Sequence, residues 1–209
     1  MADSLPVNQA PCPLRRLACE RKNRVAGHGR AGDTGPMNTT LSPDASAQAL
    51  AVRPAYRVRP ISADFLRRVR EQGLDDLGQP VEHHIAQGGE PCRDVLRRAH
   101  PGEALILASH CPLALPGPYR EFGPVFVRAT AGESTLPLSA LPLQGPQPYL
   151  GTRFVLRAYS AQERIVDGQV VEAHEAEALL LQQLDRAEVA FVLARFAGYG
   201  CFAARIERA

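Results

Sequence analysis

The 209-residue sequence contains no tryptophan, a single lysine and few aromatic residues of any kind. Because aromatic residues make up only 6% of the chain, a core must be built mainly from Leu, Val, Ile and Ala, each of which buries less surface than an aromatic ring. The apolar content of 45% is nevertheless typical of a folded domain. The composition therefore excludes a chain that is disordered throughout.

Long apolar runs are also missing. The longest are about the length of Val189–Ala194, whereas a bilayer-spanning helix needs roughly 18 apolar residues. The first thirty residues lack the apolar core of a secretory signal. The five cysteines are an odd number, which favours reduced thiols over a disulfide framework. We therefore expect a cytoplasmic protein with no membrane partner.

Positive charge is concentrated at the N-terminus, although the whole chain has a formal net charge of +2. Residues 1–36 hold six basic and three acidic residues, which leaves 18 basic and 19 acidic residues and a net charge of −1 in the remainder. A nearly neutral domain lacks the basic surface that nucleic acids attract. We expect no nucleic-acid partner.

The N-terminal segment has the composition of a tail. Residues 1–36 are rich in Pro and Gly without a periodic apolar pattern, so they bury too little surface to offset the entropy of ordering. We expect a disordered tail over residues 1–54, of which residues 1–36 are an over-extended gene start; a basic regulatory arm is the alternative. A single domain is expected over residues 55–209.

The rest of the chain predicts short strands joined mostly by turns. Strands are expected at Tyr56–Arg59, Val81–Ile85, Cys92–Leu96, Glu103–Ser109, Val125–Arg128, Arg153–Tyr159, Val189–Arg195 and Cys201–Glu207. One helix should begin at Ser62 and end near Gly73, and a second should cover His174–Asp185. Asp167-Gly168 suggests a tight hairpin. This pattern predicts an α+β fold, mainly an antiparallel sheet with about two helices on one face.

Two cysteines are the candidate catalytic residues. Cys92 and Cys201 each stand at the start of an expected strand, and a neighbouring arginine, Arg93 or Arg195, would favour the reactive thiolate. A nucleophile also needs a base within reach, and no local pattern selects one histidine for that role. The alternative is that both are small buried apolar residues, as cysteines often are.

No motif for a metal ion or a cofactor is present. The adjacent His83 and His84 point to opposite faces of an expected strand, and His110-Cys111 has no zinc-ligand spacing. The sequence also lacks a phosphate-binding loop and a dinucleotide fingerprint. We therefore expect no metal site and no cofactor.

Several arginines lie on or beside expected strands, and their convergence would create an anion site. Arg93, Tyr119 and Arg195 are the candidate ligand-binding residues. Solvated or ion-paired arginines are the alternative, because the domain is nearly neutral.

Three segments together resemble one family. They are PCRDVLRRAHPGEALILASHCPL, PYREFGPVFVRA, and LRAYSAQERIVDG with the C-terminal ARFAGYGCFAARIERA. Their order resembles the bacterial family known as domain of unknown function 1203, from about Tyr56 to Ala209. The resemblance implies a single-domain cytoplasmic protein without an assigned activity. From the candidate arginines and cysteines themselves we expect a binding domain for a small anionic molecule or a partner segment, or alternatively a small enzyme with Cys92 or Cys201 as its nucleophile.

Overall fold

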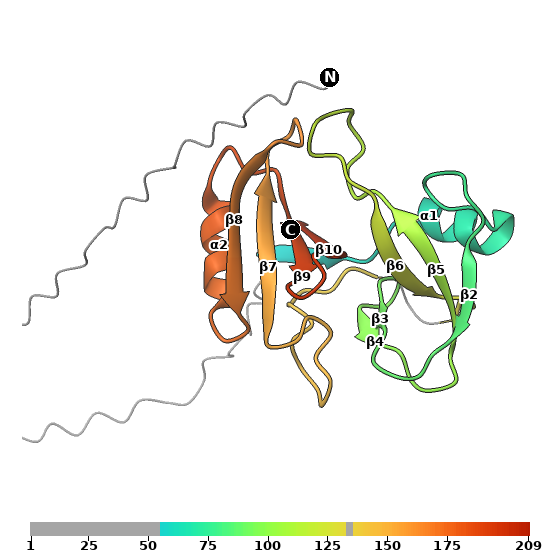
Figure 1. The fold of residues 1–209 in the computed structure, drawn as a ribbon. Coiled ribbons are helices and arrows are strands. Elements are labelled where there is room, and N and C mark those ends of the chain that lie inside the picture. Colours follow the sequence, from blue (N-terminus) through green and yellow to red (C-terminus); the bar gives the residue numbers. More distant parts are fainter. Residues whose placement is uncertain (1–54, 133–135) are drawn as a thin grey trace, which may run out of the picture. The chain divides into compact units, whose positions relative to one another are not determined.

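The computed structural model describes residues 55–132 and 136–209. The expected N-terminal tail and gene start, residues 1–54, lie outside the described residues. Within the described part the protein has an α+β fold, with mostly antiparallel strands, as the sequence predicted. Figure 1 shows the strands divided between two sheets, where the sequence had suggested one.

The first sheet is built mainly from the C-terminal third of the chain. Its order is β1-β10-β9-β7-β8, with every neighbouring pair antiparallel. The strands are β1 (Tyr56–Arg59), β7 (Arg153–Tyr159), β8 (Ile165–Glu172), β9 (Phe191–Phe196) and β10 (Phe202–Arg208). Helix α2 (Ala176–Asp185) packs on this sheet and buries Ala176, Leu180 and Leu184 against it.

The second sheet has the order β2-β5-β6-β3-β4. Its strands are β2 (Glu82–Ile85), β3 (Pro91–Cys92), β4 (Arg97–Arg98), β5 (Ala104–His110) and β6 (Gly123–Arg128). The pairing of β3 with β6 is parallel, and the other pairs in this sheet are antiparallel. The expected strand Cys92–Leu96 is thus shorter than predicted, because the chain turns directly after Cys92.

The helix predicted after Ser62 forms with the expected caps. The Ser62 hydroxyl accepts the N–H of Phe65 at 3.2 Å and caps α1 (Ala63–Arg67). The helix continues as one π-helical stretch, η1 (Arg68–Gln72), and ends at Gly73, whose φ of +66° is left-handed. Phe65 and Leu66 are buried, so this helix anchors the segment that precedes β2.

The predicted hairpin at Asp167-Gly168 is wrong. Both residues lie inside β8, which pairs without interruption along β7 up to a bulge near Tyr159. The turn lies earlier, at residues 160–164, where the N–H of Ser160 donates to the carbonyl oxygen of Arg164 at 2.9 Å. Asp-Gly therefore marks no turn here, because strand pairing with β7 determines its conformation.

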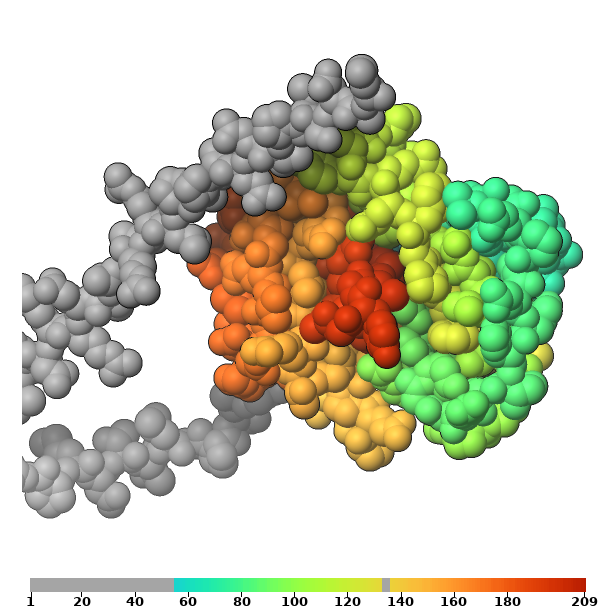
Figure 2. Space-filling view, viewed as in Figure 1, coloured from blue at the N-terminus to red at the C-terminus, as the bar shows by residue number. Residues whose placement is uncertain are grey.

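A shared hydrophobic cluster joins the two sheets. It combines Val125 and Val127 of β6 with Tyr159 of β7, Leu193 of β9 and Phe202 of β10. Figure 2 shows the red C-terminal segment lying between the orange strands of the first sheet and the green and yellow segments of the second. The end of β9 and the start of β10 thus lie beside the second sheet. Among the described residues, no helix is long and apolar enough to cross a membrane.

Candidate functional site

A tight turn after β3 sends the Arg93 side chain inward. The N–H of Leu96, a residue with φ of +53°, closes this turn on the carbonyl oxygen of Cys92. The Arg93 guanidinium donates through Nε to the carbonyl oxygen of Phe202 at 3.0 Å and through Nη1 to that of Pro91 at 2.7 Å. Arg93 is only 3% exposed. Backbone carbonyls of both sheets therefore hold this charged group in place.

A second arginine, Arg98 of β4, shares the aromatic surface on which Arg93 lies. Its Nη1 donates to the carbonyl oxygen of Gly89 at 2.9 Å. The guanidinium carbons of Arg93 and Arg98 lie 5.0 Å and 5.1 Å from the centroid of the Phe196 ring, within cation–π range. Among the described residues, neither guanidinium pairs with a carboxylate. Two positive charges therefore meet one ring without a counter-charge.

Burial makes these two charges costly. It lowers the pKa of both Arg93 and Arg98, because a guanidinium removed from water loses part of its hydration. Arginine nevertheless stays protonated in proteins. A bound anion would compensate this cost, as a carboxylate does in a buried ion pair.

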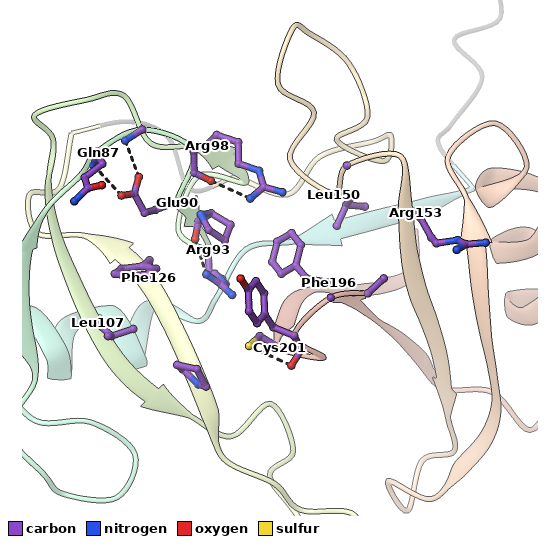
Figure 3. A pocket seen from close by; sticks show the side chains of 18 of the residues that line it. Gln87, Glu90, Arg93, Arg98, Leu107, Phe126, Leu150, Arg153, Phe196 and Cys201 are labelled. Carbon is purple, nitrogen blue, oxygen red and sulfur yellow. Dashed lines mark hydrogen bonds between the residues drawn. The ribbon is translucent and has the colours of Figure 1, made fainter.

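A cavity of about 740 Å³ opens beside the two arginines (Figure 3). Leu107 of β5 and Phe126 of β6 are directly paired across the second sheet, and both line the cavity. In Figure 3, Leu150 lies on the opposite side, with Arg93 and Phe196 between the two walls. The cavity is therefore apolar on two sides and cationic between them.

The cavity also receives one carboxylate. Glu90 accepts the backbone N–H groups of Gln87 at 2.8 Å and Gly88 at 3.0 Å. Burial raises the pKa of Glu90, but the hydrogen bonds from backbone N–H groups lower it by more. The net shift of the pKa is therefore downward. Glu90 is therefore ionised at neutral pH, with both carboxylate oxygens occupied by the backbone.

Cys201 is the candidate nucleophile that lies in this cavity. Its side chain is half-buried, and Sγ lies 3.7 Å from the carbonyl oxygen of Tyr199. Cys201 lines both the large cavity and an adjoining one of about 170 Å³, whose wall includes His110. No described histidine forms a hydrogen bond to its thiol. A thiol and an arginine pair thus share one cavity, without an attached base.

Cys92, the other candidate nucleophile, is placed differently. It is fully buried, and burial together with the nearby Asp94 carboxylate raises the pKa of its thiol to about 12. Its Sγ lies 3.9 Å from the carbonyl oxygen of Glu90. Cys92, a residue of β3, packs in a small buried cluster with Ala86, Ala99 and Leu105. The structure therefore does not bring Cys92 and Cys201 together in one cavity.

Tyr119 and Arg195 also lie apart from Arg93's cavity. Tyr119 is 40% exposed, and its ring centroid is 5.9 Å from the Arg164 guanidinium carbon. Arg195 forms an ion pair with Glu121 and donates to the carbonyl oxygen of Gly200 at 2.6 Å. The charge of Arg195 is therefore already neutralised. Such ion pairing is the alternative to an anion site that the sequence left open for the strand arginines.

A largely buried carboxylate–histidine pair lies near the smaller cavity. Nδ1 of His110 is 2.8 Å from Oδ2 of Asp76, which also accepts the N–H of Cys111 at 2.8 Å. The rings of Phe65 and Phe202 pack edge-on against the imidazole. Burial, together with nearby arginine charges, lowers the pKa of His110 to about 4. The imidazole is therefore neutral at pH 7, and Asp76 selects the tautomer with its proton on Nδ1.

Of the residues in this cavity, Arg93 was a candidate from the sequence, whereas Arg98 and Phe196 were not. In the sequence Arg97 and Arg98 are equivalent neighbours, yet Arg97 forms an ion pair with Glu103 at 2.5 Å whereas Arg98 points to Phe196. No local signal separates them. Within residues 55–132 and 136–209, no three His, Cys, Asp or Glu side chains gather closely enough to hold a metal ion.

A protein-family model matches this chain. A family model described as "Protein of unknown function (DUF1203)" matches residues 89–208, which is more than half of the chain. The matched range contains Glu90, Arg93, Arg98, Phe196 and Cys201. Neither the curated proteins nor the solved structures gave a significant match.

Proposed function

The chain belongs to the DUF1203 family, and because that description assigns no activity, we propose from the site alone that this domain binds a small anionic molecule. The observation that carries the proposal is the pair of arginines, Arg93 and Arg98, stacked on Phe196 without a carboxylate partner among the described residues. Guanidinium groups with free N–H donors are suited to hold a carboxylate or a phosphate.

The position of the arginines supports a ligand site over a purely structural role. A buried charge is normally paired, because an unpaired one costs several kcal/mol. Arg93 uses Nε and Nη1 for carbonyl oxygens, and its remaining donors have no partner among the described residues. The adjoining cavity of about 740 Å³ falls within the range of small-molecule sites, roughly 300–1,000 Å³.

The shape of the site favours a small molecule over an acidic partner segment. The two arginines lie between the apolar walls of the cavity, and the Arg93 side chain is only 3% exposed. A side chain of a partner protein would have to bring its backbone into the same cavity. A free small anion meets no such constraint.

Thermal unfolding in the presence of simple anions tests this function. We expect acetate, sulfate and phosphate, each at matched ionic strength, to raise the unfolding temperature of the wild-type protein, since a ligand that binds only the folded state stabilises it. Arg98→Gln should reduce this response, because it removes one guanidinium. Arg67→Gln, which changes an exposed arginine paired with Asp64, should respond as the wild type does. Equal responses of all three proteins would refute the site.

A cysteine enzyme is the second candidate function, and one observation favours it. Cys201 lines the cavity of Arg93 and is partly accessible, so an anionic substrate held by the arginines would lie near its thiol. Attack by the thiolate on a carbonyl carbon would require a group to accept the thiol proton. His110 is the candidate for this role, because it lines the adjoining small cavity together with Cys201.

Alkylation with iodoacetamide separates the two functions. An activated Cys201 would be carboxamidomethylated in the folded protein at neutral pH many times faster than the thiol of a cysteine in a short peptide. Peptide mapping reads each cysteine separately, and Cys92 serves as the internal buried control. A rate for Cys201 at or below that of the peptide would end the enzyme hypothesis and leave the binding function untouched.

A further inference from the structure

We propose that the ligand is a monocarboxylic acid with an apolar body of about the size of a ring. This inference rests on the proposed function, since it names the chemical class that the same site would bind. It depends on three further features of the cavity: its net charge, its paired apolar wall and the geometry of its arginines.

The charged residues that line the cavity leave one positive charge uncompensated. They are Arg93, Arg98, Arg153 and Glu90. Arg153 is already paired with Glu172 at 2.8 Å. Glu90 carries one negative charge against the two positive charges of Arg93 and Arg98. The site therefore matches a single negative charge.

This charge balance favours a carboxylate over a phosphate monoester. A phosphate monoester carries close to two negative charges at pH 7 and three strong acceptor oxygens. In this cavity the second charge would face the Glu90 carboxylate without a further cation to oppose it. A carboxylate has one charge and two oxygens, which match the fork of a guanidinium.

The apolar wall requires a ligand with more than an acid group. Leu107 and Phe126 are directly opposite each other in the register of β5 and β6, so their side chains lie together on one face of the second sheet. Both are only partly buried, whereas Leu150 across the cavity is 2% exposed. When a ligand covers apolar surface that is still accessible in a concave site, the free energy of the complex falls. A ligand with an apolar body is therefore favoured.

The arginines are already arranged for the acid group. Both guanidiniums rest on the Phe196 ring, and backbone carbonyls of Pro91, Phe202 and Gly89 hold them there. Because these side chains are ordered before binding, a ligand does not have to offset the loss of their rotamer entropy. The acid group would then lie against the arginines, and its body would reach towards Leu107 and Phe126.

Four small probes of related shape test the inference on the full-length protein by calorimetric titration. Phenylacetate has the charge and the ring, acetate lacks the ring, phenylacetamide lacks the charge, and phenyl phosphate has nearly two charges. We expect phenylacetate to bind at least tenfold more tightly than each of the other three. Arg98→Gln should weaken phenylacetate and acetate alike, whereas Phe126→Ala should weaken phenylacetate at least fivefold and leave acetate unchanged.

The outcomes separate the inference from the function beneath it. Tighter binding of phenyl phosphate, or equal binding of acetate and phenylacetate, would overturn the proposed ligand class while the anion site stands. If none of the anionic probes binds the wild-type protein, or if Arg98→Gln leaves their binding unchanged, both the ligand class and the anion site are overturned. If Phe126→Ala fails to fold, the comparison of the four probes on the wild-type protein still decides, and Phe126→Leu replaces the variant.

Discussion

Asp94 is the residue on which the charge balance inside the second sheet depends. Its carboxylate is fully buried and accepts from Nη2 of Arg70 at 2.8 Å, from Nε of Arg128 at 3.1 Å and from the Arg128 backbone N–H at 3.2 Å. The group thus compensates two arginines that are themselves largely buried. Arg93, which immediately precedes Asp94 in the chain, is not one of these two arginines and lines the cavity instead.

Replacing Asp94 should therefore destabilise the protein strongly. Asp94→Asn breaks the buried ion pairs with Arg70 and Arg128 by removing one partner, which typically costs about 3–5 kcal/mol. Urea unfolding measures the change, with Asp64→Asn as a control because its ion pair with Arg67 is exposed and should contribute less than about 1 kcal/mol. Similar losses for the two variants would contradict the structural role of Asp94.

The low pKa of His110 makes the free energy of unfolding depend on pH. Its pKa is about 4 in the folded protein, whereas an unfolded histidine has a value near 6.5. Between these two pKa values the unfolded chain binds more protons than the folded one. The contribution of His110 to stability is therefore complete above pH 6.5 and is lost as the pH falls towards 4. We expect the free energy of unfolding to fall between pH 7.5 and pH 5, by about 2 kcal/mol from this residue alone.

The variant His110→Asn isolates this contribution. Its side-chain amide can still donate to Asp76 but does not titrate, so the variant should lose less stability than the wild type over the same pH range. Nitrogen-15 NMR of the imidazole supplies an independent readout, and we expect a neutral ring with its proton on Nδ1 at pH 6. A protonated ring at pH 6, or parallel stability profiles of the two proteins, would contradict the prediction.

At the residue scale, the sequence could identify the types of side chain in the site but not their partners. Arg93 and Arg195 were both candidate anion ligands, because each lies on or beside an expected strand. Only the fold shows that Arg195 pairs with Glu121, 74 positions away along the chain, whereas Arg93 meets Phe196. Ion pairs between distant residues leave no local pattern, so an occupied arginine and an available one look alike in sequence.

At the scale of elements, local signals predicted helix ends better than strand pairings. Ser62 and Gly73 both cap the α1–η1 helix as expected, since capping depends on residues within the same few turns. The Asp167-Gly168 hairpin was wrong, because β8 is fixed by its pairing with β7. The carboxylate of Asp167 also pairs with Arg186, which lies just beyond α2. Pairing and packing outweighed the local turn preference.

Gly73 allows a direct test of helix termination. Its φ of +66° is strained for any residue with a Cβ, although no neighbouring atom would meet the added methyl group. Gly73→Ala should therefore cost about 1–2 kcal/mol, from backbone conformation alone. Urea unfolding measures it, and Gly117→Ala is the matched control, because Gly117 lacks a positive φ and also has open space around its Cβ position. Equal effects of the two substitutions would contradict the explanation.

At the scale of the whole domain, the sequence predicted the fold class but not the division into two sheets. Alternating patterns assign residues to strands, and they do not show which strands pair. The site depends on that missing information, since Phe126 and Leu107 come from one sheet and Phe196 from the other. A cavity formed by both sheets is therefore beyond prediction from the strand pattern, even though most of its individual elements were predicted.

The cluster shared by the two sheets predicts that they unfold together. Phe202 of β10 is 6% exposed and packs with Val125 and Val127 of β6, and its ring centroid lies 5.2 Å from that of His110. Phe202→Ala removes a large side chain from this cluster, which should cost about 3–5 kcal/mol. Because both sheets contribute to the cluster, native-state hydrogen exchange should accelerate equally for the most protected amides of β5 and of β9.

Val170→Ala is the control, because this position is 61% exposed, and it should change neither the stability nor these exchange rates. Faster exchange confined to one sheet would show instead that the sheets are separate folding units, and that the cavity between Phe126 and Phe196 can open without unfolding either of them.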